Sequence, residues 1–520
     1  MTKNYQKSFT LTEVLIVTSI IAIFTSFVFI AMSGTRAGSR DSKRVAEVDS
    51  IRTALEYYYY DNKEYPESLN WIKIEEDEDT NGPFTQVMKN PQYLPIIPRD
   101  PLYGKVTEAE VPYSYQYQST EDKKGYKIHV ELEKGGSYEV YAAGGKGLVY
   151  GGIGPGPSIT VGTTSSDEGL LGPRHWKSFY ANGRYWVWYC TNGNWGYRSS
   201  TDGSSWSNFA TVSGCWNTEG WHCSVFFDGT YVHWQRNNLT SGFDLFYQRG
   251  IPNSDGSITW SAGTQTVHNG SLFNRHDEGT IAVDSNGYAF IWDKHYSSNT
   301  PYAWKNATNT GVWITDTGFP YKLNTGTTEW RGLIVPLTNG KMYAVYAVEN
   351  QVIRGRLWNG SNWEAEETNV ADYNLASVPE WGGALSATAM GDDVYFAYLR
   401  ASTPQVRFNK RVYGTGWQTS DELVQDSVTN RSAPVITMDT STGDSYVFWA
   451  GSPAANHIYY KRRMSWGAWD SNPVDWVDES TDGLTRNDSI TGYFKKYGSR
   501  IGLVYLTGSS SPYDIKFKSF

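Results

Sequence analysis

The chain has 520 residues, with 45 lysines and arginines against 54 aspartates and glutamates, which gives a formal net charge of −9 at pH 7. Charges of both signs are scattered without a basic stripe, which excludes nucleic acid as an expected partner. The length requires at least two folded units, and 15% aromatic residues with 51 glycines favour short strands joined by tight turns.

The first feature along the chain is an apolar segment. Residues 9–32 read FTLTEVLIVTSIIAIFTSFVFIAM and carry a single charge, at Glu13. As a helix this segment would span roughly 36 Å, which is enough to cross a bilayer core of about 30 Å. A secretory signal peptide would have a shorter apolar region before a small-residue cleavage site. We therefore expect a single-pass membrane helix. A carboxylate inside it costs roughly 2.5 to 3.5 kcal/mol on insertion scales and needs a cationic partner.

The surroundings of this segment resemble those of a type IV prepilin or a type II secretion pseudopilin. A short leader with two lysines precedes FTLTE, and the amphipathic run SRDSKRVAEVDSIRTALEYYYYDNKEYP follows. The resemblance implies that a prepilin peptidase cuts between Ser8 and Phe9, although the family usually has glycine where this chain has Ser8. It also implies that Glu13 pairs with the freed amine of Phe9 in a neighbouring subunit. The alternative is an ordinary anchor with a solvated Glu13.

The resemblance extends to about residue 145. YPESL, YLPIIPRDPLYG, PYSYQYQS and GYKIHVEL follow the pseudopilin order of long helix, proline-rich loop and small antiparallel sheet. It implies a cytoplasmic N-terminus and an exported remainder, in the periplasm or outside the cell. The acidic run EEDEDTNG at residues 75–82 lacks EF-hand spacing, so we expect a solvated loop there. We predict no metal and no other cofactor.

A repeated unit fills the chain after residue 158. Turns followed by aromatic strands start near residues 182, 228, 286, 339, 391, 442 and 497. Tryptophans recur every 50 to 54 residues, at Trp206, Trp260, Trp313, Trp363, Trp417 and Trp469. A four-stranded unit of this period is typical of a propeller blade. We predict a mainly β fold with a seven-bladed β-propeller, with six blades as the alternative. Residues 158–166 would supply the outer strand of the last blade.

These features predict the domain organisation. We expect a prepilin leader at 1–8, a pilin-like helix and small sheet domain at 9–145, a Gly- and Pro-rich linker at 146–157 and the propeller at 158–520. Three cysteines, Cys190, Cys215 and Cys223, lie in the propeller. A Cys215–Cys223 bridge in an oxidising compartment and ordinary buried thiols are both open interpretations.

Two turns of the propeller resemble the Asp-box turn of sialidase-like propellers. They read STDGSSW, with Asp202 and Trp206, and SDGSITW, with Asp255 and Trp260. In such a turn the aspartate caps the turn's own amides and the tryptophan packs between strands. We therefore predict a structural and not a catalytic role for these four residues.

Candidate ligand-binding residues lie where the chain enters each innermost strand, because that end would face the central mouth. Trp can stack on sugar rings, while Arg, Asp and Glu can hydrogen-bond to hydroxyls or carboxylates. The alternative role is to cap strand ends and bond to neighbouring blades. The candidates are Arg174, His175, His222, Arg275, His276, Asp277, Glu278, Glu329, Trp330, Arg331, Glu380, Trp381, Arg431, Arg486, Asn487 and Asp488.

Two enzymatic interpretations remain open. A sialidase would need three arginines on the substrate carboxylate and a Tyr/Glu pair, and the arginines are present, but the family's motifs cannot be matched to specific positions. A polysaccharide lyase is the second, since residues 275–295, RHDEGTIAVDSNGYAFIWDKH, loosely resemble His-containing repeats of propeller lyases. A neutral His175, His222, His276 or Tyr296 would then take the proton beside a uronate carboxylate.

The leading hypothesis is a pilin-like surface subunit that presents a propeller for glycan or surface-ligand binding. The N-terminal helix would assemble with other pilin-like subunits, and many tethered copies would convert weak sugar binding into avidity. The alternatives are a carbohydrate-active enzyme and a structural component of a secretion pseudopilus. Whether the assembly is a pilus or a pseudopilus is left open by the sequence.

Overall fold

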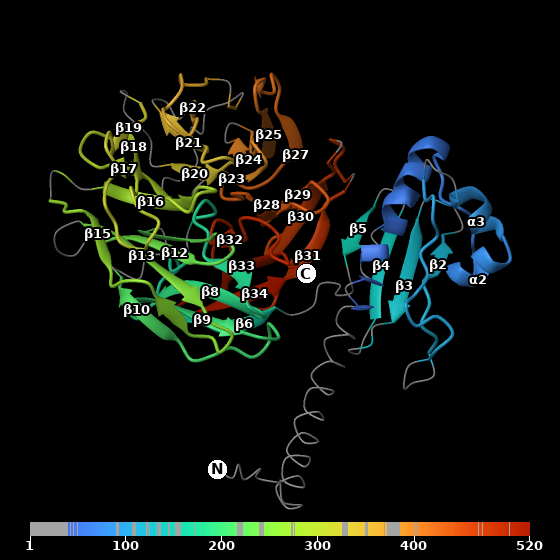
Figure 1. The fold of residues 1–520 in the computed structure, drawn as a ribbon. Coiled ribbons are helices and arrows are strands. Elements are labelled where there is room, and N and C mark those ends of the chain that lie inside the picture. The colour runs from blue at the N-terminus through green and yellow to red at the C-terminus, as the bar shows by residue number, and fades with distance from the viewer. Residues whose placement is uncertain are drawn as a thin grey trace, which may run out of the picture. The chain divides into compact units, whose positions relative to one another are not determined.

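The described residues of the computed structural model run from Arg40 to Ser519 (Figure 1). They exclude positions 42, 45, 49, 90–92, 107–110, 121–122, 124, 132, 134–136, 144–145, 151–157, 171, 216–221, 239–243, 272–273, 275, 325–330, 349–351, 369, 372–384, 401–402, 466, 471 and 499. The predicted span 9–32, with Ser8 before it, lies outside them. Within the described part, no helix is both long and apolar enough to cross a membrane. The chain divides into two compact units, Met1–Ile153 and Gly154–Phe520.

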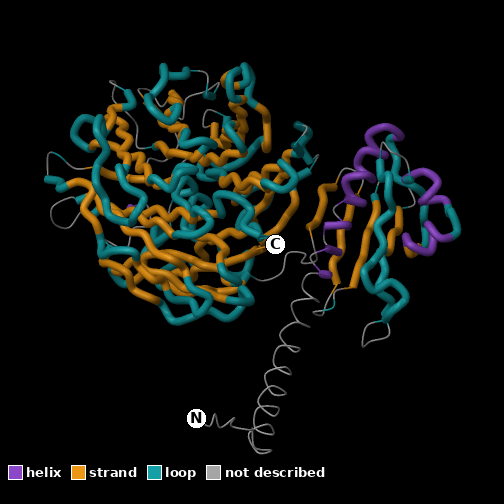
Figure 2. The backbone as a smooth tube through the Cα atoms, viewed as in Figure 1, coloured by secondary structure: helices purple, strands orange, loops and turns teal. Residues whose placement is uncertain are grey.

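The first unit combines helices with an antiparallel sheet (Figure 2). Residues 50–62 are helical, and two short helices follow, α2 (Ile74–Asp79) and α3 (Pro83–Met88). Inward-facing residues of β3, such as Ile128 and Val130, share one core with Ile51 and Leu55 of the long helix. The sheet has the order β1 (Ile72–Lys73), β2 (Gln116–Ser119), β3 (Tyr126–Glu131), β4 (Ser137–Ala143) and β5 (Lys146–Tyr150).

Two expectations for the first unit were wrong. The acidic run at residues 75–82 starts within helix α2, and Glu75 is fully buried. Its Oε1 accepts hydrogen bonds from the backbone N–H groups of Tyr115 (3.0 Å) and Asp100 (3.1 Å), which offset part of the cost of burying the carboxylate. The predicted linker, 146–157, begins with strand β5, which pairs with β4 and continues the sheet into the glycine-rich segment.

The second unit is a β-propeller with seven antiparallel sheets among its described residues (Figure 1). In each sheet the first strand lies nearest the axis. The first strands contact one another in succession from β11 to β32, and β32 contacts β7. Val225 N–H of β11 donates to Trp176 O, just before β7, at 2.8 Å. The first strands are β7 (Ser178–Ala181), β11 (Cys223–Phe227), β16 (His276–Val283), β20 (Gly332–Pro336), β23 (Leu385–Met390), β28 (Val435–Asp439) and β32 (Ile490–Gly492).

The remaining strands extend each blade outward. The second strands are β8 (Arg184–Thr191), β12 (Val232–Asn237), β17 (Ala289–His295), β21 (Met342–Val348), β24 (Asp393–Arg400), β29 (Asp444–Ala450) and β33 (Gly502–Thr507). The third strands are β9 (Asn194–Ser200), β13 (Leu245–Pro252), β18 (Thr300–Lys305), β22 (Val352–Trp358), β25 (Gln405–Val412), β30 (His457–Arg463) and β34 (Tyr513–Ser519). The outer strands are β10 (Ala210–Gly214), β14 (Ile258–Trp260), β15 (Gln265–His268), β19 (Tyr321–Lys322), β26 (Gly416–Trp417), β27 (Glu422–Gln425), β31 (Val474–Asp478) and β6 (Ile159–Thr164).

The ring is closed by a strand from the beginning of the unit. β6 pairs antiparallel with β34, with Thr164 opposite Tyr513 and Ile159 opposite Phe517. This pairing removes the exposed edge that the last blade would otherwise have. It confirms the prediction that residues 158–166 complete the final blade, and the seven sheets agree with the favoured count.

The tight turns of the repeats follow from their Asn-Gly sequences. Asn182 and Gly183 have φ values of 52° and 75°, and Asn339 and Gly340 have 54° and 72°. Two successive positive φ values are typical of the type I′ turn, whose twist matches that of the paired strands. The strands after these turns bury their large aromatic residues.

The structure corrects the cysteine pairing. A disulfide joins Cys190, on β8, to Cys215, directly after β10, within one blade. Cys223 is a buried free thiol, and the indole N–H of Trp234 donates to its sulfur at 2.9 Å. Because Cys215 is bonded to Cys190, it cannot also pair with Cys223, which begins the first strand of the next blade.

Candidate functional site

The end of the ring where the first strands begin is called the N-side here, and most of its predicted ligand residues are buried. Arg174, before β7, forms an ion pair with Glu278 on β16, and both side chains are at most 2% exposed. His222 Nδ1 lies 3.1 Å from Asp277 Oδ1, with both residues 1% exposed. These pairs link different blades, as the alternative interpretation of the sequence expected.

The backbone around Glu278 is unusual. Glu278 has a φ of 56°, and the register between β16 and β17 shifts between Asp277 and Thr280. Asn237 Oδ1 accepts the N–H of Gly279 at 3.2 Å. Because of this bulge, two adjacent residues contact different partners: Glu278 pairs with Arg174, and Asp277 lies next to His222.

Burial dominates the electrostatics of the N-side. It raises the pKa of Glu278 to about 7, against the opposing effect of Arg174. It lowers the pKa of Lys177 to about 7 and holds that of His175 well below its usual range. His175 is therefore a neutral ring in the interior, and not an exposed cation for a ligand.

His276 belongs to a cluster of rings at the beginning of β16. Its Nδ1 lies 2.9 Å from Asp293 Oδ1, and Asp293 Oδ2 accepts the indole N–H of Trp304 at 2.9 Å. The rings of His268 and His295 lie 4.8 Å and 5.1 Å from the His276 ring. Burial lowers the pKa of both His268 and His295. Within this cluster the His276 side chain is 4% exposed, whereas His268 and His295 are partly buried.

The other predicted N-side residues differ in their surroundings: some are buried or form ion pairs, two are exposed, and five lie outside the described part of the chain. Arg331 is 2% exposed. Arg486 pairs with Glu168 at 2.6 Å and with Asp488 at 3.0 Å. Asn487 donates to Thr429 Oγ1 at 3.0 Å. Two more exposed residues are the Arg431 side chain, at 45%, and Tyr296, at 37%. The described residues do not include Arg275, Glu329, Trp330, Glu380 and Trp381.

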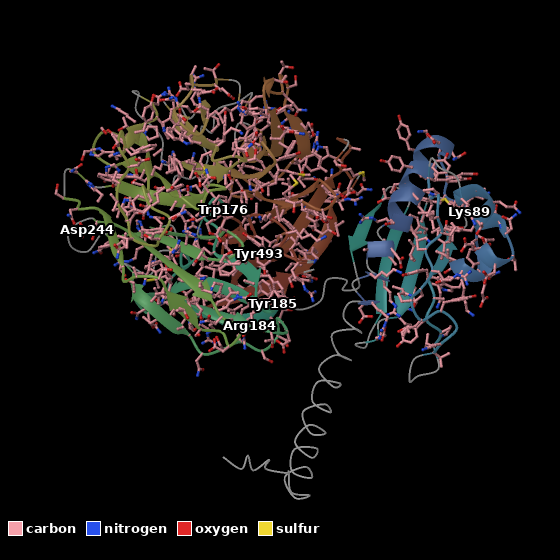
Figure 3. All side chains as sticks on the ribbon, viewed as in Figure 1. Lys89, Trp176, Arg184, Tyr185, Asp244 and Tyr493 are labelled. Atoms are coloured by element: carbon pink, nitrogen blue, oxygen red, sulfur yellow. A yellow bond between two sulfur atoms is a disulfide. The ribbon has the colours of Figure 1, made fainter. Side chains whose placement is uncertain are left out.

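Three aromatic rings pack together near the axis. Trp176 (Figure 3), Phe226 and Phe494 come from the blades of β7, β11 and β32. Their ring centroids are 5.0 to 5.7 Å apart, and each residue is at most 4% exposed. Trp176 directly follows the buried Arg174 and His175. The three rings therefore join the blades of β7, β11 and β32 next to these buried N-side residues.

A cavity opens at that other end, where the first strands finish. Its volume is about 600 Å³, and we call it the C-side cavity. Phe226 and Phe494 of the aromatic cluster also line it. Six of the first strands each provide one polar or flexible lining residue, at the end of the strand or shortly after it. These residues are Asp228, Asp284, Thr338, Met390, Thr440 and Lys495. A concave site with mixed apolar and polar walls on the axis is the arrangement that a small ligand needs.

One wall of the C-side cavity carries a stacked pair. The guanidinium of Arg249 lies 4.0 Å from the ring centroid of Tyr231 and donates to Asn309 O. Arg249 Nε also lies 3.3 Å from Ser261 Oγ. These contacts fix a planar cation beside an aromatic ring on the cavity wall.

The carboxylate of Asp228 is largely committed to the protein. Its Oδ1 accepts the N–H groups of Thr230 and Tyr231, each at 2.7 Å, and its Oδ2 lies 3.0 Å from His233 Nε2. His233 Nδ1 in turn lies 3.0 Å from the hydroxyl of Tyr247. Asp228 therefore shapes the turn that forms the cavity rim.

Sequence reasoning missed the C-side cavity. The predicted site lay at the beginnings of the first strands, whereas the cavity is lined by their ends, and the predicted ligand residues are absent from its described lining. The signal was present, because the recurring turns at Asp228, Asn286 and Gly391 lie at or beside this rim. In the sequence these turns indicate only the blade boundaries. The folded structure is needed to show that they surround the same C-side cavity.

The two Asp-box-like turns show capping geometry. Asp202 Oδ1 accepts the N–H groups of Ser204 and Ser205, each at 2.8 Å, and these bonds lower the pKa of Asp202. Asp255 Oδ1 accepts the N–H of Ser257 at 2.8 Å. Two tryptophans follow these turns: the Trp206 ring packs 5.3 Å from Phe517, and Trp260 lies 6.4 Å from Trp188. The relationship to sialidase-like propellers stays a prediction.

No cluster of three or more His, Cys, Asp or Glu side chains among the described residues is arranged to hold a metal ion. The acidic side chains of the C-side cavity are distributed over different blades and bond to turn amides.

Comparison with known proteins bears on the N-terminal region. Residues 3–29 match the family described as the prokaryotic N-terminal methylation motif. The type II secretion system core protein G of Vibrio cholerae is 29% identical over 154 residues, which cover 30% of this chain and 90% of that protein. The protein of the same name from Aeromonas hydrophila is 29% identical over 101 residues, covering 19% and 71%. The pseudopilin-like N-terminal region predicted from the sequence is confirmed.

Solved structures similar to the chain include a polysaccharide lyase and a lectin. The polysaccharide lyase Uly1 has 10% sequence identity and a TM-score of 0.41, covering 70% of this chain and 99% of the lyase. The Aleuria aurantia lectin, described as a six-bladed β-propeller, has 14% identity and a TM-score of 0.36, covering 58% and 91%.

Proposed function

We propose that this chain is a pilin-like subunit of the cell envelope whose propeller binds a saccharide in the C-side cavity. The observation that carries the binding part is the cavity itself, about 600 Å³ on the propeller axis. Its walls alternate apolar residues, such as Phe226 and Leu337, with polar ones, such as Thr338 and Asn309. A sugar ring offers both apolar C–H faces and hydroxyls, so it matches such mixed walls.

The N-terminal part of the proposal is supported by the methylation motif at residues 3–29 and the similarity to core protein G. A prepilin peptidase would cut before Phe9, and Glu13 would pair with the new amine of a neighbouring subunit. The span 9–32 would cross the membrane with the propeller exported, in the periplasm or outside the cell. The helix would assemble with other pilin-like subunits, so a weak saccharide site would be presented in many copies.

A glycan array with the full chain in detergent micelles tests the binding part. The expected result is retention of a defined group of saccharides by native protein, and none by protein unfolded before application. Absence of native binding across neutral and acidic glycans would overturn the saccharide proposal. It would leave a structural role in a pilus or pseudopilus as the function of the chain.

A carbohydrate-active enzyme is the second candidate, because Asp293 holds His276 Nδ1 at 2.9 Å. Such a contact fixes the tautomer of the ring and makes Nε2 its basic nitrogen, as a proton-abstracting histidine requires. Incubation of the full chain with uronate polysaccharides would then give unsaturated products, and His276→Gln would abolish them. Absence of both unsaturated products and new reducing ends would remove this candidate, whatever the array shows.

A further inference from the structure

Lys495 lines the C-side cavity beside Phe494 of the aromatic cluster, and the backbone around it is fixed. Thr388 Oγ1 donates to Phe494 O at 2.7 Å, and Lys496 N–H donates to Met438 O at 2.7 Å. Residue 495 is thus held between the blades of β23 and β28. Two neighbouring blades therefore fix the backbone from which the Lys495 side chain reaches the cavity.

Two adjacent lysines have different surroundings here. Lys496 Nζ forms an ion pair with Asp439 Oδ2 at 2.7 Å. Lys495 Nζ has no ion pair among the described residues, and it lies 5.9 Å from the centroid of the Tyr497 ring. The Asp228 carboxylate acts on Lys495 electrostatically, but its oxygens are occupied by Thr230, Tyr231 and His233. Partial burial lowers the pKa of Lys495, and the attraction of the Asp228 carboxylate offsets only part of this effect.

The cavity is also lined by the carboxylate of Asp284, which would repel an anionic ligand bound next to it. Asp284 Oδ1 accepts the N–H groups of Asn286 and Tyr288, each at 2.9 Å. Asp284 follows β16, whereas Lys495 follows β32, so the two groups come from different blades around the rim. A ligand that suits both Lys495 and Asp284 has a negatively charged acceptor near Lys495 and a hydroxyl donor near Asp284.

Resting on the proposed function, we propose that the C-side cavity selects acidic saccharides, with the sugar carboxylate bound by Lys495 and a sugar hydroxyl donating to Asp284. Lys495 supplies one positive charge, which matches the single negative charge of a carboxylate. The second cation of the wall, Arg249, is stacked on Tyr231 and donates to Asn309 O. A charge-assisted hydrogen bond of this kind strengthens binding by about tenfold or more.

The test compares a hexuronate oligosaccharide with its carboxyl-reduced, neutral counterpart, using calorimetric titration of the full chain in detergent. The native chain is expected to bind the acidic sugar about tenfold more tightly, and Lys495→Gln is expected to bind both sugars equally. The matched control is Lys322→Gln, an exposed lysine of β19 outside the cavity lining, which should keep the preference.

The outcomes separate the two proposals. Equal binding of both sugars by the native chain, or an acidic preference that persists in Lys495→Gln, would overturn the acidic selection and leave saccharide binding intact. Tighter binding of a sulfated counterpart than of the hexuronate would also overturn the assignment to a carboxylate. No binding of any sugar would instead refute the proposed function on which the inference rests.

Discussion

Arg174 and Glu278 form a buried ion pair that joins the segment before β7 to the bulge in β16. Glu278 takes a positive φ to make this contact, and burial disfavours the charge on both partners. Removing one partner from such a pair is more costly than replacing both, because the remaining charge is left uncompensated in the interior.

Glu278→Gln is therefore expected to lower the free energy of unfolding by about 3 to 5 kcal/mol. Urea denaturation followed by tryptophan fluorescence would measure it, since all but one of the tryptophans lie in the propeller. The control is Asp482→Asn, which breaks the ion pair with Lys516 at 3.1 Å, where the Asp482 side chain is 46% exposed. It should cost less than about 1 kcal/mol. Equal costs for the two variants would contradict the structural role of the Arg174–Glu278 pair.

Glu75 gives the first unit a defined pH dependence. Burial raises its pKa to about 7 in the folded chain, from an ordinary value of 4.5. Between these values the folded state binds more protons than the unfolded state, so the free energy of unfolding should fall as pH rises, by up to about 3 kcal/mol. Calorimetry from pH 4.5 to 7.5 would show this slope, and Glu75→Gln should flatten it. An unchanged slope in the variant would assign the pH dependence to other groups.

The disulfide makes a separate prediction about the three cysteines. One thiol, that of Cys223, should react with a thiol reagent after unfolding without reductant, and Cys223→Ser should leave none. Cys215→Ser should lower the free energy of unfolding by about 3 kcal/mol, as expected for a bridge that spans 25 residues. A count of three thiols, or a peptide map that joins Cys215 to Cys223, would be incompatible with the pairing described here.

The role proposed for Glu13 can be tested in cells that assemble the filament. Glu13→Ala should leave membrane insertion unchanged, because it removes a charge from an apolar span, and should reduce incorporation into sheared filaments. Thr12→Ala, one residue away, keeps the carboxylate and should assemble normally. Normal incorporation of the Glu13 variant would point to a solvated carboxylate without a partner amine.

Local sequence patterns were sufficient to predict the blades. Asn-Gly turns such as Asn182-Gly183 favour positive φ values and mark several of the hairpins, and the spacing of Trp206, Trp260 and their successors sets the period. The closing strand was predictable because the last unit lacked an outer strand and residues 158–166 preceded the first. These predictions depend on neighbours in sequence or on the count of repeated units.

The site could not be predicted in the same way, because its contacts join distant segments. Arg174 and Glu278 are 104 residues apart, and only their burial shows that they belong to the interior. Lys495 and Lys496 look equivalent in the sequence, yet Asp439, far upstream, pairs with Lys496. Cys190 was likewise not expected to pair with Cys215, because their proximity depends on the order β10-β9-β8 within the blade.

Filling the C-side cavity tests the central claim most directly. Met390 lines the cavity and Val412, on β25, does not, although both are 37% exposed. Calorimetric titration of the full chain should show that Met390→Trp reduces the affinity for a saccharide ligand at least tenfold, whereas Val412→Trp leaves it unchanged. Undiminished binding by a folded Met390→Trp chain would show that the saccharide does not bind in this cavity.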